Sequence, residues 1–207
     1  IHFLSEFYSI YVSNPSKYLE YALKGVILDS SSYDSTTAAF KYFHLSNAFL
    51  QAGFTDEAQQ YVDKSLAYNP SSPFPVYVQS TIVYTRKKNF SDARQILVNE
   101  LIRDSTRFDL LQEIGKMSYL MGDYKGAYGY YKKLMKVRDM MQIDLYKNEN
   151  LKIGIVLSRL GFKGQSEELI NDFKNYAESD RSGCKHWKLA LYYSHQGEKQ
   201  QALVHLR

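Results

Sequence analysis

The chain repeats itself at a spacing of about 35 residues, and this repetition constrains the fold more than any other property. Five segments fall into register when their small residues are aligned: 40–70, 76–105, 110–139, 151–173 and 186–206. One column of the alignment holds Ala58, Ala93, Ala127, Ser166 and Ala202. Each copy contains two apolar segments at helical spacing with a short break between them. The sequence therefore predicts one pair of helices per copy, with the small residues where the two helices cross.

The break inside each copy carries the signals of a helix end followed by a helix start. Four copies have glycine there: Gly53, Gly122, Gly161 and Gly197. A left-handed residue often ends a helix, and glycine adopts that conformation most easily. Lys88 takes this place in the remaining copy, where we expect Asn89 to adopt the unusual backbone angle. Asn89 and Asp123 also have the side chains of helix N-caps.

The glycine-rich stretch YLMGDYKGAYGYYKKL, residues 119–134, has two interpretations, a phosphate-binding loop or a bend between helices. A P-loop has the spacing GxxxxGK[ST] after a strand. Here Gly122, Gly126 and Gly129 are spaced differently, no Lys-Ser/Thr pair follows, and the preceding segment has helical periodicity. We interpret Gly122 as the end of one helix and place Gly126 and Gly129 inside the next.

Small, aromatic and proline residues recur at fixed places in the copies. In the 110–139 copy they are Gly115, Gly122, Tyr124, Ala127 and Tyr131, and in the 40–70 copy they are Leu45, Phe49, Gly53, Ala58 and Pro70. This arrangement resembles the tetratricopeptide repeat (TPR) family, whose repeat has 34 residues. The copies depart from the family pattern at Ser46, Lys88, Ser105 and Asp139. The resemblance covers residues 38–207 and implies an all-α fold, a right-handed superhelical solenoid of antiparallel helix pairs.

We expect one TPR-like helical-repeat domain over residues 1–207, as a fragment of a larger protein. Its predicted repeats are 1–37 (divergent), 38–73, 74–106, 107–140, 141–181 and 182–207. Pro15 suits the first turn of a helix, and 30–37 has the composition of a polar linker. Residues 140–150 add about five residues to the usual period, which predicts a lengthened helix rather than a domain boundary.

Motifs of reactive chemistry are missing from the sequence. It has no HExxH, CxxC or GxSxG motif. Cys184 and His186 are two residues apart, so a helix points them to different sides and they make poor joint metal ligands. The net charge of +4 neither demands nor excludes an anionic partner, and no apolar run approaches the ~20 residues that span a bilayer. We expect no catalytic activity, cofactor, metal or membrane partner, and the cytoplasm is the favoured location.

The resemblance implies a partner-binding groove, because in TPR proteins the first helices of the pairs line a concave surface that binds a peptide or a partner helix. The residues projected onto this groove are Phe43, Asn47, Leu50, Val78, Ile82, Arg86, Gln112, Lys116, Tyr119, Ile155, Arg159, Trp187, Leu191 and His195. Apolar anchors beside Asn47, Lys116, Arg86 and Arg159 favour an apolar peptide with acidic or carboxylate character. The apolar residues would serve equally well to pack adjacent repeats, and the basic ones to form an ordinary solvated surface.

The predicted function is a protein-interaction scaffold, a regulatory arm of a larger transcription-regulatory, signalling or assembly protein. The alternative is a nucleic-acid-binding helical repeat, because residues 85–89 and 130–138 cluster basic side chains, the latter with tyrosines. A base-reading repeat would carry the same polar residues in every copy, which this chain does not. Homo-oligomerisation through exposed solenoid ends is also open, with Leu203 and Leu206 at the end of the last copy.

Overall fold

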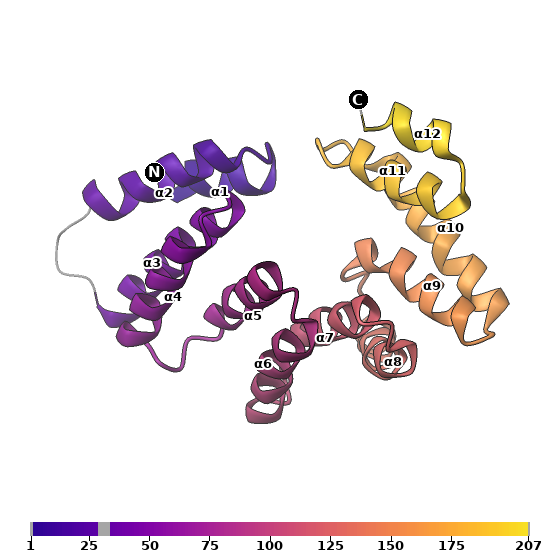
Figure 1. Cartoon of the computed structure of the whole chain (residues 1–207), viewed down its shortest axis with the longest axis horizontal. Coiled ribbons are helices and arrows are strands. Elements are labelled where there is room, and N and C mark those ends of the chain that lie inside the picture. Colours follow the sequence, from indigo (N-terminus) through magenta and orange to yellow (C-terminus); the bar gives the residue numbers. More distant parts are fainter. Residues whose placement is uncertain (1, 29–33, 207) are drawn as a thin grey trace. The chain divides into compact units, whose positions relative to one another are not determined.

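A computed structural model describes residues 2–28 and 34–206, and over these residues it contains helices and no strand. In chain order the elements are α1 (His2–Ile10), α2 (Pro15–Leu28), α3 (Ser35–Gln51), α4 (Thr55–Tyr68), α5 (Pro75–Lys87), α6 (Phe90–Arg103), α7 (Asp109–Leu120), α8 (Tyr124–Met141), the 3-10 helix η1 (Lys147–Glu149), α9 (Asn150–Arg159), α10 (Lys163–Ser179), α11 (Lys185–Gln196) and α12 (Lys199–Val204) (Figure 1). The predicted all-α fold is confirmed. Pro15 begins α2, as expected. Most of the predicted linker 30–37 lies outside the described residues.

The chain divides into two compact units, Ile1–Leu97 and Val98–Arg207. In the first unit α1 packs on α2, α3 on α4, and α2 on α3. In the second unit the pairs are α7 with α8, α9 with α10, and α11 with α12, and α10 also packs on α11. Consecutive helices thus form hairpins that stack within each unit. The assignment of all hairpins to one domain stays a prediction.

The small-residue column lies where the two helices of each pair cross, as predicted. Ala58, Ala93 and Ala127 are fully buried, and Ser166 and Ala202 are nearly so. A larger side chain at such a position would force the helices apart, at a cost of about 1–3 kcal/mol. The short side chains are therefore required by the close approach of the helices.

At three of these crossings a buried serine links the two helices of the pair. In each case the serine Oγ donates a hydrogen bond to a backbone carbonyl of the facing helix: Ser46 to Ala58 (2.7 Å), Ser80 to Ala93 (3.0 Å) and Ser166 to Gly154 (2.8 Å). The donor is on the first helix of the pair in the first two cases and on the second helix in the third. Ser46 departs from the family pattern, but it stays small and satisfies its hydroxyl inside the core.

The turn between paired helices has left-handed backbone in each of the five copies. The φ angles are 90° at Gly53, 75° at Gly122, 90° at Gly161 and 78° at Gly197, as the glycine positions predicted. In the remaining copy Lys88 itself is left-handed, with φ 50°. The expectation that Asn89 takes this angle was wrong, because the angle belongs to the residue that ends α5. Asn89 is an N-cap instead, and its Oδ1 accepts from the backbone N–H of Asp92 at 3.1 Å.

The stretch 119–134 is a joint between helices, as predicted. Gly122 lies in the turn after α7, and Gly126 and Gly129 lie inside α8. Asp123 caps α8, because its Oδ1 accepts from the N–H of Gly126 at 2.9 Å. The helix-end and cap signals were therefore correctly interpreted.

The insertion at 140–150 is only partly the lengthened helix that the spacing predicted. α8 has 18 residues, against 14 in α4 and in α6. The helix then ends at the left-handed Gln142, and the rest of the insertion forms a turn and η1. Glu149, at the end of η1, is buried and accepts hydrogen bonds from Tyr131 Oη at 3.1 Å and Lys152 Nζ at 2.8 Å. These polar contacts fix the inserted segment onto α8 and α9.

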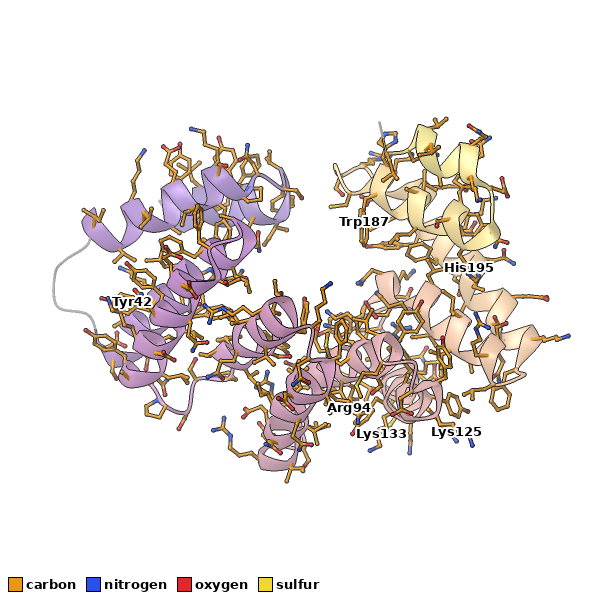
Figure 2. All side chains as sticks on the ribbon, in the orientation of Figure 1. Tyr42, Arg94, Lys125, Lys133, Trp187 and His195 are labelled. Carbon is orange, nitrogen blue, oxygen red and sulfur yellow. The ribbon has the colours of Figure 1, made fainter. Side chains whose placement is uncertain are left out.

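Aromatic side chains of α3 and α4 stack on one another within their hairpin. The ring of Tyr42, labelled in Figure 2, stacks on Tyr61 and Tyr68, with centroids 6.1 Å and 5.4 Å away. The ammonium group of Lys64 lies 4.8 Å from the centroid of Tyr61, a cation–π distance. These contacts fasten α4 to α3 beyond the crossing at Ala58.

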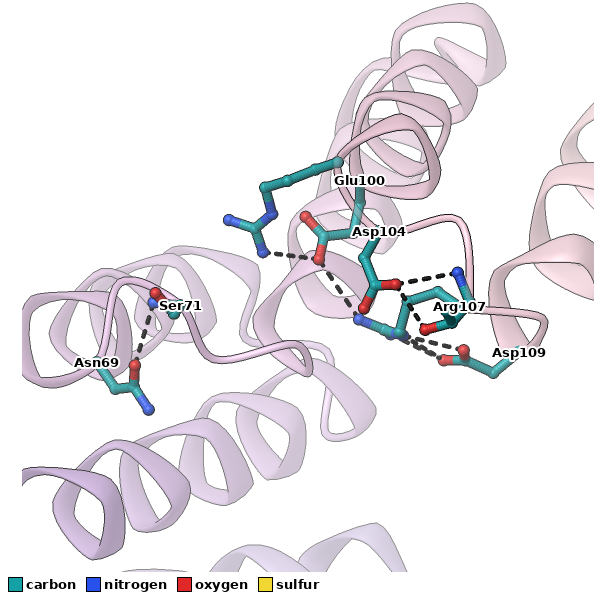
Figure 3. Close-up of polar contacts among 8 residues, drawn as sticks. Asn69, Ser71, Glu100, Asp104, Arg107 and Asp109 are labelled. Carbon is teal, nitrogen blue, oxygen red and sulfur yellow. Dashed lines mark hydrogen bonds and ion pairs between the residues drawn. The ribbon is translucent and has the colours of Figure 1, made fainter.

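The turn between α6 and α7 is held by ionic contacts (Figure 3). The guanidinium of Arg107 donates to both carboxylate oxygens of Asp109, from Nε at 2.9 Å and from Nη2 at 2.8 Å. Its Nη1 also lies 3.4 Å from Glu100 at the end of α6. Asp104 accepts from the backbone N–H of Thr106 at 3.0 Å, which forms the turn itself. This junction lies within the second unit and connects the last turn of α6 to the first turn of α7.

Candidate partner-binding surface

Two of the predicted groove residues are core residues of the first unit. Val78 and Ile82, on α5, are each 2% exposed. They cluster with Ala58 and Val62 of α4. Their side chains stack one hairpin on the next and are not accessible to a ligand. They therefore belong to the core and not to an exposed binding surface.

The other predicted residues on α3 are also occupied by contacts within the first unit. Phe43 and Leu50 are half-buried against the same cluster, and the Phe43 ring lies 5.5 Å from that of Phe74. Asn47 donates from Nδ2 to the hydroxyl of Tyr18 at 3.3 Å. These side chains serve the packing of α3 against its neighbours.

Three predicted polar residues have partners, one on a facing helix and two on their own helix. Arg86 forms an ion pair with Asp56. Lys116 forms one with Glu113, a turn earlier on α7, and Gln112 donates to the same Glu113 from Nε2 at 2.9 Å. The charges of Arg86 and Lys116 are thus balanced by carboxylates of their own unit.

Four side chains of the second unit come together at the ends of α7, α9 and α11 and the start of α8. We call Tyr119, Tyr124, Arg159 and His195 the Arg159 cluster. The rings of Tyr119 and Tyr124 are 6.2 Å apart, and the guanidinium carbon of Arg159 lies 6.0 Å from the Tyr124 centroid. His195, labelled in Figure 2, lies near the end of α11. Three of these residues were predicted from the sequence. Tyr124 was missed as a site residue, although it directly follows the turn.

The electrostatics of the Arg159 cluster favour an anionic group. Partial desolvation lowers the pKa of His195, and the positive charge of Arg159 lowers it further. Burial raises the pKa of Tyr119, and the neighbouring Tyr124 adds to this, while Arg159 opposes it. Arg159 is exposed, and no ion pair with a carboxylate of the described part of the chain is found for it. A bound carboxylate would balance its charge.

A polar hollow adjoins the cluster. Its volume is about 380 Å³, and its lining comes from α9, α10 and α11 and the turns beside them: Ser158, Lys163, Ser166, Glu167, Ile170, Asn171, His195 and Gln196. His195 thus lies in the wall of a hollow that is large enough for one or two side chains of a ligand. Hydroxyl and amide groups in the same wall can donate to a carboxylate or a backbone carbonyl.

The last three predicted residues lie elsewhere on the second unit. Ile155 is half-buried and packs against Leu151 and Ile170. Trp187 and Leu191, on α11, are 53% and 39% exposed. They line a second, more apolar hollow of about 470 Å³ between α11 and α12. The predicted groove residues therefore separate into packed, ion-paired and exposed groups.

The basic and tyrosine-rich segment of α8 is arranged unlike a base-stacking platform. Lys125 and Lys133 are exposed and extend from α8 (Figure 2). The rings of Tyr128 and Tyr130 are half-buried against the core of the second unit. Lys133 lies over the Tyr130 ring, 5.7 Å from its centroid. The tyrosine faces are thus taken up by packing and cation–π contacts.

Metal-site clusters and membrane-spanning helices are absent from the described residues. Within residues 2–28 and 34–206 no cluster of three or more His, Cys, Asp or Glu side chains has the geometry of a metal site. Over the same residues, the helices are too short or too polar to cross a bilayer. His186 and His205 do meet, with their Nδ1 atoms 3.1 Å apart, a contact that the sequence spacing did not reveal.

The chain has the tetratricopeptide-repeat fold, as the repeat pattern predicted. Solved structures that resemble it include YrrB, a TPR protein with an unusual peptide-binding site, at a TM-score of 0.52 and 17% identity over 91% of this chain and 90% of YrrB. PilF of Pseudomonas aeruginosa has a TM-score of 0.63 and 15% identity, over 98% of this chain and 85% of PilF. The APC/C hetero-tetramer Cut9-Hcn1 gives a TM-score of 0.68 at 16% identity, and the match covers 98% of this chain but 37% of that one. No family model and no curated protein matches the sequence.

Proposed function

We propose that the chain is a protein-interaction scaffold whose second unit binds an acidic peptide or partner segment at the Arg159 cluster. The observation that carries the proposal is the exposed guanidinium of Arg159, held over the ring of Tyr124 and beside His195. A cation placed on an aromatic face and lacking an ion-pair partner among the described residues is ready to receive a carboxylate.

The neighbouring groups suggest how such a ligand would lie. A carboxylate at Arg159 would have the half-buried Tyr119 ring on one side and the polar hollow beside His195 on the other. An apolar side chain of the ligand can contact the tyrosine rings, and a following polar group can reach Ser158 or Asn171 in the hollow. Binding of a negative charge would also raise the pKa of His195 toward its ordinary value, because it screens Arg159.

YrrB, which has the same fold, is a TPR protein with an unusual peptide-binding site. It is therefore a precedent for peptide recognition by this fold. The proposal includes no catalytic role. Such a scaffold would act as a regulatory arm of a larger protein. We do not propose nucleic-acid binding, because the tyrosines of the basic segment are packed against the core.

The test is a selection of binders from a display library of random twelve-residue peptides, followed by titration calorimetry with synthetic copies of the selected peptides. We expect the binders to be enriched in Asp or Glu beside apolar residues. Arg159→Ala should weaken their binding by about 10- to 100-fold, since a hydrogen bond to a charged group contributes roughly 1.5–3 kcal/mol.

Arg103→Ala is the matched control, because Arg103 is also exposed but is paired with Glu100 at 2.7 Å. It should leave peptide affinity unchanged. Selected peptides that bind the Arg159→Ala protein as tightly as the wild type would refute the proposed site. A selection that yields no binder would refute the peptide-binding function.

A further inference from the structure

The last helix pair brings two histidines into contact. His186 lies in the first turn of α11, and His205 directly follows α12. Their Nδ1 atoms are 3.1 Å apart and their ring centroids 5.3 Å apart. Because one neutral imidazole can donate from Nδ1 while the other accepts there, the pair forms a hydrogen bond. Neither ring has an ion pair with a carboxylate among residues 2–28 and 34–206.

The surroundings hold one of the two rings and leave the other accessible. The ring of His205 stacks on that of Tyr193, with centroids 5.5 Å apart and an angle of 3° between the planes. Tyr193 is half-buried and packs against the cluster that Phe173 and Tyr192 form with their neighbours. His186 is exposed on α11. The His205 ring is therefore positioned by the core of the second unit, while the His186 ring can turn to meet a ligand.

The separation of the two Nδ1 atoms fits two ligands of one metal ion. Imidazole nitrogens bind Zn²⁺ at about 2.0–2.1 Å, so two of them lie about 2.9 Å apart at a bond angle of about 90° and about 3.3 Å apart at the tetrahedral angle. The observed 3.1 Å falls between these values. Binding also requires both lone pairs to point at the ion rather than at each other. A rotation of the exposed His186 ring about its Cβ–Cγ bond supplies this change.

The two donor atoms select the class of ion. Imidazole suits Zn²⁺, Cu²⁺ and Ni²⁺, whereas carboxylate and carbonyl oxygens suit Mg²⁺ and Ca²⁺. The contact has two imidazoles and no carboxylate partner among the described residues, so it favours a divalent transition-metal ion. Two protein ligands are fewer than the three or four of catalytic and structural zinc sites. The remaining positions on the ion are therefore open to water or to a donor atom of a partner.

We propose that His186 and His205 bind one divalent transition-metal ion, such as Zn²⁺, through their Nδ1 atoms. Two water molecules leave the hydrated ion, and the two Nδ1 lone pairs take their places. The proton on one Nδ1 moves through solvent to Nε2 of the same ring, so the neutral pair releases no net proton. The bound ion links α11 to α12. The sequence predicted no metal, because the two histidines are 19 residues apart and only the folded hairpin joins them. The proposal does not rest on the Arg159 cluster.

The test is titration calorimetry of the protein with ZnCl₂ and, separately, with NiCl₂. We expect one ion per chain with a dissociation constant on the order of 10 µM, because the site has half the ligands of a structural zinc site. His186→Gln and His205→Gln should each weaken binding at least about 10-fold, since a single imidazole remains. MgCl₂ should not bind. Cys184→Ser is the matched control, because Cys184 is a potential metal ligand at the start of α11 that the proposal leaves out, and this variant should bind as the wild type does.

The fluorescence of Trp187, the single tryptophan of the chain, reports binding at this place (Figure 2). Trp187 directly follows His186, so bound Ni²⁺ should quench its emission, and an excess of Zn²⁺, whose d shell is filled, should restore it. Neither effect should occur in His186→Gln. At about 1 mM ZnCl₂ the melting temperature of the wild type should rise by about 5 °C, and that of His186→Gln should not. Circular dichroism checks that each variant is folded.

Four results would overturn the proposal. The first is a wild type that binds neither ion at these concentrations. The second is binding that persists in His186→Gln, which changes an exposed side chain and should leave the fold intact. The third is loss of binding in Cys184→Ser, since the thiolate would then be a ligand in place of one imidazole. The fourth is Mg²⁺ binding as tightly as Zn²⁺, which would place the site at carboxylates.

Discussion

Replacing Gly115 with alanine should destabilise the second unit, although alanine favours a helix more than glycine does. A Cβ atom at Gly115 would lie 2.6 Å from Cε1, 2.8 Å from Cδ1 and 3.0 Å from Cζ of Tyr131. The Tyr131 ring is fully buried, and its hydroxyl is bonded to Glu149. The ring therefore cannot move away without breaking other contacts.

The magnitude follows from two opposing effects. Overpacking of a tight core costs about 1–3 kcal/mol, and the gain in helix propensity is about 1 kcal/mol. The net change should be a loss of roughly 1 kcal/mol in the free energy of unfolding. Gly129 is the matched control, because it also lies inside a helix but a Cβ there would meet no atom within 4 Å. Gly129→Ala should therefore increase stability by about 0.5–1 kcal/mol.

The assay is urea unfolding followed by far-UV circular dichroism, with the midpoint and the slope fitted for each variant. Since both variants gain the same propensity, the difference between them measures the overpacking alone. The coupling can be isolated by repeating Gly115→Ala in a Tyr131→Leu background, where the clash with the ring is gone. If Gly115→Ala proved as stabilising as Gly129→Ala, the close contact between α7 and α8 described above would be refuted.

Three other substitutions test separate features of the fold. Lys88→Gly should raise the free energy of unfolding by about 1 kcal/mol in a denaturant titration, because lysine is strained at φ 50° and glycine is not. Burial alone would raise the pKa of Asp180, but hydrogen bonds from Lys188 and the following turn outweigh it and lower the pKa to about 2. The ionised carboxylate therefore stabilises the fold above about pH 4, and on the order of 1–2 kcal/mol should be lost between pH 4 and 2 in the wild type but not in Asp180→Asn, as thermal unfolding against pH would show. Arg107→Ala should lower stability by about 1–3 kcal/mol in the same denaturant titration, because it leaves the carboxylate of Asp109 without its bidentate partner.

The helix hairpins could be predicted from the sequence because close backbone approach and left-handed turns restrict residue type. Only a small side chain fits where Ala58 or Ala127 lies, and glycine is the residue that adopts φ near 75° without strain at Gly122. These physical requirements place a small residue and a turn residue at fixed positions in each repeat. The all-α TPR fold could therefore be derived before any coordinates were known.

The binding surface could be predicted only in part. Helical periodicity says on which side of a helix a residue lies, but not how far the next hairpin covers that side. Val78 and Arg159 are both projected onto the groove, yet the first is buried and the second exposed. The buried carboxylate of Glu149 was also missed, because its partner Tyr131 lies 18 residues earlier and no local pattern links them.

The serine bonds at the helix crossings have a consequence for how substitutions in this chain combine. The hydroxyl comes from the first helix at Ser46 and from the second helix at Ser166, so either helix of a pair can supply it. Ser46→Ala and Ala58→Ser should each lower the stability of the fold when made alone. Made together they would compensate one another, because the hydroxyl donor moves from α3 to the facing position on α4. Tolerance to mutation at these places belongs to the pair of facing residues rather than to either one.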